Sequence, residues 1–367
     1  MMRLTSTLLA GLLLLAAPAH AQECAAPAEV CAAKDAVFAV SSFSPVGSAV
    51  RIYEDLLVTN RHVVADETRV EVFTADGAVV IAEVVPTDYP GDLVLLRAPG
   101  LPPGPTLTPA EVTQGEVRSI GANVGAGRVG VLAPGAVTAL PEPGHPLARV
   151  HYSAETKPGN SGGALVDEAG NFVAIIASGG EGRNEAIPAT ELAKLQAASG
   201  PDRLEASQAA GAKVRECYTR VEEHGLRGAP LDDAAAEDLS EVCLATGNRQ
   251  YYDLAGQILG QGRRADAAVD LFEAALEQDP NSVNSLLSLA ITLHLAGRYE
   301  EELPHLRWMM ERSPEDPQVL RLSVQAGKWG GDPELAESAY RQIAETFPQQ
   351  AEAARNFLDS DAPPPTR

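Results

Sequence analysis

The chain has little positive charge and no metal-binding motif. Its 367 residues carry 28 lysines and arginines against 50 aspartates and glutamates, a formal net charge of -22. Because no cluster of lysine or arginine interrupts this acidic balance, nucleic acid and anionic membrane surfaces are not the expected partners. No Cys-x-x-Cys or His-x-x-x-His pair is present, so we expect no metal site and no cofactor.

Long apolar runs are also missing after the first residues. MMRLTSTLLAGLLLLAAPAHAQ joins a short positive start, an apolar stretch and the small-residue ending Ala19-His20-Ala21. This arrangement predicts a secretory signal over residues 1–21, cut before Gln22. The alternative is a membrane anchor, but the uninterrupted apolar stretch is shorter than the ~20 residues that a span needs. No cysteine stands at the cut, as a lipoprotein signal would require, and no membrane span is expected in the mature chain.

Only four cysteines remain after such a cut. An even number behind a secretory signal predicts disulfides in an oxidising compartment, although four cysteines allow three pairings. Proximity along the chain favours Cys24 with Cys31, in an N-terminal segment over residues 22–35, and Cys217 with Cys243.

Two different patterns divide the rest of the chain. From about residue 36 to 200, short apolar runs such as AVRIY, DLVLLR and FVAIIASGG alternate with Gly, Pro and Asp turns. This pattern is typical of an all-β sandwich or barrel. From residue 201 the spacing becomes helical and strand-like runs disappear. The predicted fold class is therefore a multidomain β + α protein, with a β domain followed by an α-helical one.

The helical half repeats itself. Pro280, Pro314 and Pro348 are 34 residues apart, and the unit ending at Pro280 matches the tetratricopeptide pattern at Tyr252, Gly256, Leu259, Ala268, Phe272 and Ala275. We predict about three such units over residues 249–352, after a helical cap over 201–248 and before a disordered tail over 353–367. A generic helical bundle is the alternative. Stacked units form a concave face, which is the expected site for a protein partner.

A serine on a glycine-rich segment carries the candidate chemistry. Ser161 lies in KPGNSGGALVD, and a serine nucleophile needs a base, a group that orients the base, and donors for the oxyanion. His62, in DLLVTNRHVVAD, stands at the end of a predicted strand, which suits a reacting side chain on a rigid scaffold. Asp92, in YPGDLVLLR, precedes an apolar strand, where a carboxylate needs a partner such as an imidazole N–H.

TNRHVV, GDLVLLR and PGNSGGALVD, in this order, resemble the trypsin-type serine proteases, most closely the HtrA/Deg branch of bacterial envelope proteases. The resemblance covers roughly residues 36–200. It implies two six-stranded β-barrels with the site between them, a protein or peptide substrate, and a periplasmic location. Nothing after Ser199 is strand-like, so the PDZ domains that usually end HtrA-like enzymes are replaced here by the helical repeats.

The same resemblance assigns roles to residues. Ser161 would be the nucleophile, His62 the general base, and Asp92 the orienting carboxylate. The backbone N–H groups of Gly159 and Ser161 would form the oxyanion hole. Gly159 would turn its N–H toward the substrate, while Gly162 and Gly163 would leave room for the scissile carbonyl.

Two positions bear on specificity and activation. Glu155 lies six residues before Ser161, where trypsin-like enzymes have the base of the primary specificity pocket, so it is a candidate for selecting Lys or Arg. A solvated loop residue is an equal alternative, because HtrA-like enzymes usually prefer small aliphatic residues. Asn160 replaces the aspartate that pairs with a new N-terminus in digestive proteases of this type, so activation by cleavage is not implied.

Three functions remain open at this point. The first is a secreted serine endopeptidase whose repeats recruit a protein substrate or partner. The second is a catalytically weak, protease-shaped scaffold that acts through its repeats. The third, an esterase, lacks the usual Gly-x-Ser-x-Gly elbow. We favour the endopeptidase, because a scaffold has no physical need for His62, Asp92, Ser161 and the glycines together.

Overall fold

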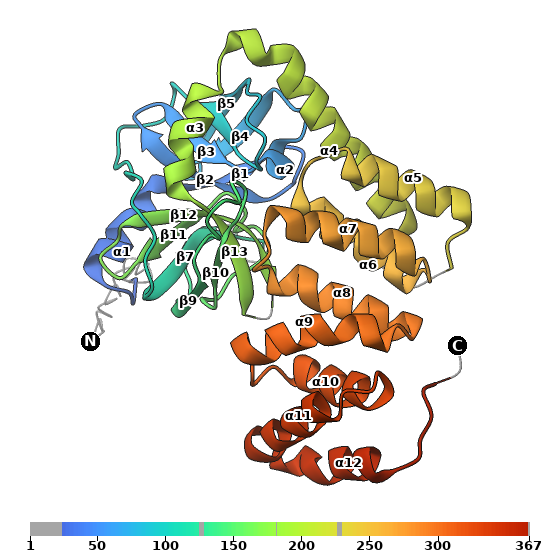
Figure 1. Cartoon of the computed structure of the whole chain (residues 1–367). Helices are drawn as coiled ribbons and strands as arrows, with labels where there is room; N and C mark the ends of the chain where they lie inside the picture. The colour runs from blue at the N-terminus through green and yellow to red at the C-terminus, as the bar shows by residue number, and fades with distance from the viewer. Residues whose placement is uncertain (1–23, 125–127, 181, 226–229, 366–367) are drawn as a thin grey trace, which may run out of the picture.

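The computed structural model describes residues 24–124, 128–180, 182–225 and 230–365. The predicted signal over residues 1–21 lies outside these ranges. A β domain and a stack of helices lie side by side, with the helices continuing away from the barrels as a curved column (Figure 1). No helix in the described ranges is long and apolar enough to cross a membrane.

The first barrel contains six antiparallel strands closed in the order β1-β2-β3-β6-β5-β4. Alternating apolar side chains fill it; in β4, Val70 and Val72 point inward while their neighbours are exposed. The short helix α2 (Arg61–Val64) follows β3 directly and carries His62. The strands are β1 (Val37–Ser41), β2 (Gly47–Tyr53), β3 (Leu56–Thr59), β4 (Arg69–Phe73), β5 (Val79–Val85) and β6 (Val94–Arg97).

The second sheet has the order β11-β12-β13-β10-β9-β7-β8, and an additional pairing of β11 with β7 closes six of its strands into a barrel. The expected pair of six-stranded barrels is therefore confirmed. An apolar cluster that includes Val50, Ile120 and Ile175 joins the two barrels. The strands are β7 (Glu116–Asn123), β8 (Arg128–Val131), β9 (Gly135–Ala139), β10 (Val150–Tyr152), β11 (Ala164–Asp167), β12 (Phe172–Gly180) and β13 (Arg183–Pro188).

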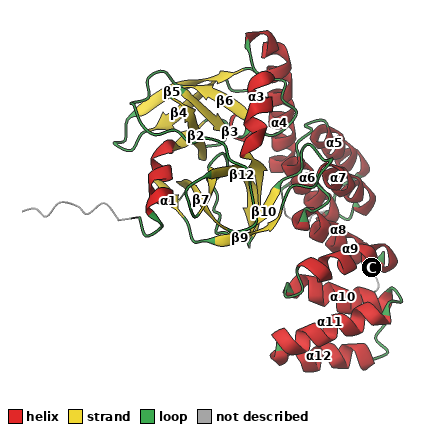
Figure 2. Ribbon diagram, turned by 60° about the vertical axis from the view of Figure 1, so that its left-hand side comes forward, coloured by secondary structure: helices red, strands yellow, loops and turns green. Residues whose placement is uncertain are grey.

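The helical half stacks as antiparallel pairs on one side of the barrels (Figure 2). In the first pair, Gly256 lies against the Phe272 ring, and a Cβ atom there would stand 2.6 Å from the ring. A small residue therefore lets the two helices cross closely, as the repeat pattern predicts. The pairs are α6 (Arg249–Gln261) with α7 (Ala265–Gln278), α8 (Val283–Ala296) with α9 (Tyr299–Arg312), and α10 (Pro317–Trp329) with α11 (Pro333–Thr346).

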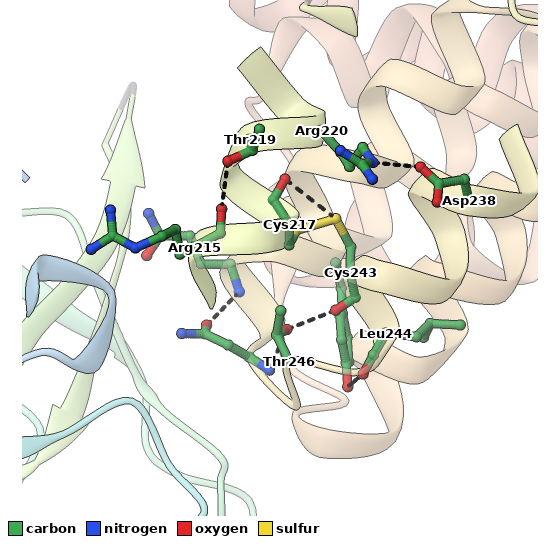
Figure 3. Close-up of a disulfide and its surroundings, with 11 residues drawn as sticks. Arg215, Cys217, Thr219, Arg220, Asp238, Cys243, Leu244 and Thr246 are labelled. Carbon is green, nitrogen blue, oxygen red and sulfur yellow. Dashed lines mark hydrogen bonds and ion pairs between the residues drawn. A yellow bond between two sulfur atoms is a disulfide. The ribbon is translucent and has the colours of Figure 1, made fainter. Parts of the chain in front are cut away.

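Two disulfides have the pairing expected from proximity. Cys24 and Cys31 flank the start of α1 (Ala28–Ala33), before the first barrel. Cys217 and Cys243 join α4 (Leu204–His224) to α5 (Asp233–Leu244), with both cysteines fully buried (Figure 3). An ion pair between Arg220 and Asp238, 2.5 Å apart, links the same two helices. This stapled hairpin connects α3 (Leu192–Ala197) of the β domain to the repeats.

The end of the chain corrects one expectation. Residues 353–359 were expected in a disordered tail, but they complete α12 (Pro348–Asp359). Phe357 packs edge-on against Trp329, with ring centroids 5.3 Å apart, and the Lys328 ammonium donates to the Phe357 carbonyl at 2.6 Å. The sequence of residues 353–359 is mostly polar and gives no sign of this packing. Only one aromatic contact and one lysine from α10 hold α12 in place.

Candidate active site

His62 and Asp92 face each other across the ends of two strands of the first barrel. His62 lies in α2, just after β3, and Asp92 lies two residues before β6. The imidazole Nδ1 donates to Asp92 Oδ2 at 2.6 Å, and the backbone N–H of His62 donates to Oδ1 at 2.9 Å. A carboxylate can only accept, so the ring carries its proton on Nδ1 and leaves Nε2 available as a base.

Asp92 is buried and strongly held. The Asn60 side-chain amide and the Arg61 backbone N–H both donate to the Asp92 carbonyl, at 3.0 and 3.2 Å. Burial acts to raise the pKa of the Asp92 carboxyl, but His62 and the Arg149 guanidinium outweigh this effect and hold the pKa below its ordinary value. The carboxylate is therefore charged at neutral pH and suited to stabilise an imidazolium.

The loop that carries Ser161 is held from both barrels. Ser48, in β2 of the first barrel, donates through its hydroxyl to the Gly159 carbonyl at 2.7 Å and through its N–H to the Ser161 carbonyl at 2.8 Å. In the second barrel, the Asn160 side-chain amide donates to the Ala122 carbonyl at 2.7 Å. Asn160 thus has a structural role at the position where digestive proteases carry an aspartate.

The two glycines after Ser161 lie against the backbone of neighbouring strands. Gly162 has a φ of +83°, and a Cβ atom there would stand 2.1 Å from the Ser48 carbonyl oxygen. A Cβ at Gly163 would stand 2.4 Å from the Ile120 carbonyl oxygen. Both glycines are buried, and their missing side chains let the loop pack closely on neighbouring strands.

Two backbone donors flank the Ser161 side chain. The N–H groups of Asn160 and Gly162 are bonded to the carbonyls of Lys157 and Ile176, at 3.0 and 2.9 Å. The N–H groups of Gly159 and Ser161, by contrast, have no acceptor among the described residues. Two unpaired donors beside a serine hydroxyl are the arrangement that an oxyanion hole requires.

The Ser161 hydroxyl itself donates to the Ala177 carbonyl in β12, at 3.3 Å. Within the described part of the chain it makes no hydrogen bond to His62. The structure thus brings His62 and Asp92 into direct contact and places Ser161 in a loop held against the same barrel. Hydrogen bonds between nucleophile and base are often loose in the absence of substrate.

Glu155 is not brought to Ser161. Its carboxylate forms an ion pair with Lys157 at 2.8 Å and accepts from the Ala133 N–H at 3.3 Å. These two contacts lower the pKa of Glu155, and about two fifths of its side chain remains exposed. Thr156 and Lys157 line the cleft beside Ser161, but Glu155 does not.

A cleft of about 810 Å³ opens beside Ser161, between the two halves of the molecule. One wall is formed by Ser161 and by β12 from Ile176 to Gly180. The opposite wall comes from α6 and α8, including Gln250, Asp253 and Leu287. Sequence reasoning missed this second wall, because single polar residues within a repeat helix carry no signal that they face another domain.

A buried ionic cluster fixes the helices at this distance from the barrel. Glu185, in β13, accepts from Arg249 of α6 and from the Ser282 hydroxyl at the start of α8, the latter at 2.8 Å. His151 of β10 contacts Asp279, before α8, at 2.9 Å. Burial acts to raise the pKa of Glu185, but Arg249, with His151 and Arg149, holds it far below its ordinary value. The repeats are therefore held against the second barrel by charged side chains that are buried from solvent.

Comparison with known proteins identifies the β domain. Residues 47–175 match the family model of the trypsin-like peptidase domain. The chain contains a trypsin-like peptidase domain. Residues 271–303, from α7 into α9, match the family model of the tetratricopeptide repeat. The peptidase domain and the repeats that the motifs predict are both confirmed.

Solved structures similar to this chain include two proteases. The HtrA-type protease AlgW with a tripeptide is 30% identical, over 46% of this chain and 61% of that chain, with a TM-score of 0.41. The Rv3671c protease in its inactive form is 26% identical, over 48% and 98% of the two chains, with a TM-score of 0.40. Among curated proteins, the uncharacterized protein y4bJ of Sinorhizobium fredii is 33% identical over 128 residues. This chain spans about a fifth of that relative's length.

Proposed function

We propose that this peptidase-domain protein is a serine endopeptidase that acts through Ser161, His62 and Asp92. The observation that carries the proposal is the 2.6 Å contact between His62 Nδ1 and Asp92, which leaves His62 Nε2 as the base for a serine flanked by two free N–H donors. None of these features is needed for a binding surface alone.

The reaction follows from these positions. Ser161 Oγ attacks the scissile carbonyl carbon while His62 Nε2 takes the hydroxyl proton, and Asp92 stabilises the imidazolium that forms. The N–H groups of Gly159 and Ser161 hold the negative oxygen of the tetrahedral intermediate. His62 then gives its proton to the leaving amine. In the second half, His62 takes a proton from water as the water oxygen attacks the acyl-enzyme, and returns it to Ser161 Oγ as the bond between this oxygen and the acyl carbon breaks.

A peptide substrate is supported by the shape of β12. Its residues from Ser178 to Gly180 pair with β13 on one side, and no other strand of the described chain covers their opposite edge. The two glycines are exposed at the cleft. An extended peptide can add to such an edge through backbone hydrogen bonds, and an endopeptidase can bind its substrate in this way.

We further propose that the protein is exported to the periplasm and that the repeats recruit a protein substrate. Two disulfides support an oxidising location, together with the signal predicted over residues 1–21. Tetratricopeptide repeats stack into a surface that binds extended partners, and here that surface borders the cleft beside Ser161.

One observation favours the second candidate, a catalytically weak scaffold. Ser161 donates to Ala177 instead of His62, so the nucleophile and the base are not joined in this structure. A fluorophosphonate probe separates the two functions, because it reacts only with an activated serine. The folded wild-type chain should be labelled and Ser161→Ala should not; if neither is labelled, the scaffold is the correct assignment. An active enzyme should also lose roughly six orders of magnitude in turnover on Ser161→Ala.

A further inference from the structure

The cleft beside Ser161 is lined by two parts of the chain that meet only in the folded molecule. Its barrel wall supplies Ser161 and the free edge of β12, and its helical wall comes from the first two repeat units, with Gln318 of the third at one end. A peptide extended along β12 from Ser161 therefore lies opposite α6. Side chains of such a peptide that point away from the barrel would face this helix across the cleft.

Asp253 is an acidic group on that helical wall. It lies in α6 and is half-buried, and its Oδ1 accepts from the Ser285 hydroxyl of α8 at 2.7 Å. The cations that line the cleft are engaged elsewhere, Lys157 with Glu155 and Arg183 with Asp316 at 2.6 Å. Among the described residues, Asp253 has no ion-pair partner within 4.0 Å.

Gln250 adds a second acceptor one helical turn before Asp253. It lines the same cleft, and its side-chain oxygen Oε1 is buried without a hydrogen-bond partner in the described structure. Residues three apart in a helix lie on the same face. A carboxylate and a buried amide oxygen on one face are acceptors that suit an ammonium or guanidinium group.

We propose that Asp253 and Gln250 form a subsite that binds a lysine or arginine side chain of a peptide held along β12. The inference rests on the proposed function, which places the peptide along β12. It means that the repeats select peptides with a basic side chain at one position. Charge complementarity decides the class of ligand, because the subsite offers acceptors and a negative charge but no free cation.

The subsite should depend on pH. Burial raises the pKa of Asp253 to about 6, although Arg249 on the same helix acts to lower it. Glu185 of β13 also raises this pKa, whereas the Ser285 hydroxyl of α8 and the Arg149 guanidinium lower it. Because Asp253 is charged above this pKa and neutral below it, a preference for basic side chains should be present at pH 7.5 and fade below about pH 6.

Binding to the full chain carrying Ser161→Ala tests the subsite without requiring turnover. The probes are labelled extended peptides that differ only in Lys or Gln at one scanned position, measured by fluorescence anisotropy. We expect Lys at one position to bind about tenfold more tightly, in the range of a charge-assisted hydrogen bond. Adding Asp253→Asn should reduce the difference below twofold, and Asp253→Lys should favour Glu over Lys at that position.

Asp270→Asn is the matched control, because Asp270 is exposed on α7 of the same repeat and lies outside the cleft lining. It should leave the tenfold preference intact. A preference that survives Asp253→Asn, or that is abolished by Glu155→Gln, overturns the assignment, as does the absence of any Lys preference. Fluorophosphonate labelling of the wild type tests the proposed function separately. If the chain is not labelled but still prefers Lys, the endopeptidase assignment is wrong and the subsite stands.

Discussion

Gly211 in α4 lies directly against the backbone carbonyl of Ala65, at the end of the helix that carries His62. A Cβ atom at position 211 would stand 2.2 Å from the Ala65 oxygen. The Arg61 guanidinium also donates to the Ser207 hydroxyl of α4, at 3.2 Å. The helical half is therefore built onto the element that holds the proposed general base, in addition to its contacts around the cleft.

Gly211→Ala should destabilise the protein. A methyl group at this position meets a backbone atom that cannot rotate away, and overpacking of this kind costs about 1–3 kcal/mol. The better helix propensity of alanine returns about 1 kcal/mol, so we expect a net loss of up to about 2 kcal/mol in the free energy of unfolding. Urea denaturation measures it. Gly130→Ala is the control, because a Cβ there has open space. Equal midpoints for the two variants would contradict the close contact.

Asp92→Asn should nearly abolish turnover while the fold is retained. The amide has the shape of the carboxylate, but it cannot stabilise the imidazolium and it favours the wrong tautomer of His62. A loss of roughly 10⁴ in kcat is expected from such a change. Steady-state kinetics on a peptide substrate measures it, with Asp270→Asn as a charge-matched control. A loss below tenfold would show that Asp92 does not orient the base.

Glu185→Gln should weaken the docking of the repeats. It removes the nearer carboxylate from the buried Arg249 guanidinium and leaves it only the 3.4 Å contact with Asp279, so we expect a loss of up to about 3–5 kcal/mol, the cost of breaking a buried ion pair. Glu168→Gln, at a partly exposed pair with Arg118, should cost less, on the order of 1 kcal/mol. Chemical denaturation of both variants gives the comparison. Similar losses in the two variants would mean that the ionic cluster does not hold the domains together.

Glu185 should also make the free energy of unfolding depend on pH in the acid range. The folded pKa of Glu185 lies below its unfolded value near 4.5, so its contribution is complete above that pH and is lost as the pH falls further. Wild-type stability should therefore fall between about pH 5 and pH 3 more steeply than that of Glu185→Gln. Thermal melting at a series of pH values measures this. If the melting temperatures of the two proteins fall in parallel as the pH is lowered, Glu185 does not have this role.

Removing the disulfide between α4 and α5 should destabilise the cap of the repeats. Cys217 and Cys243 are 26 residues apart, and closing a loop of this length is worth roughly 3–4 kcal/mol. Cys24 and Cys31, only 7 residues apart, should contribute less. Double alanine variants of each pair, compared by urea denaturation, give the order. A larger loss for the Cys24 and Cys31 variant would contradict the loop-length argument.

The sequence by itself determined the features that rest on local patterns. Strand-like runs, a 34-residue period and three ordered motifs predicted two β-barrels, the helical repeats and the contact between His62 and Asp92. Chain proximity also predicted both disulfides. Each of these follows from neighbours in sequence or from a motif with a known geometry, so it could be derived without coordinates.

Only the tertiary structure decided how the two halves meet. Glu185 reads as one polar residue in a strand, yet it is buried against Arg249, 64 residues later. Asp253 reads as an ordinary helix residue, yet it lines the cleft that contains Ser161, whereas Glu155, which is near Ser161 in sequence, does not. No periodicity encodes such contacts, because they depend on the angle at which α6 and α8 dock on the second barrel. The buried ionic cluster and the contact of α4 with the end of α2 together hold the two halves in this arrangement, and both join residues that are far apart in sequence.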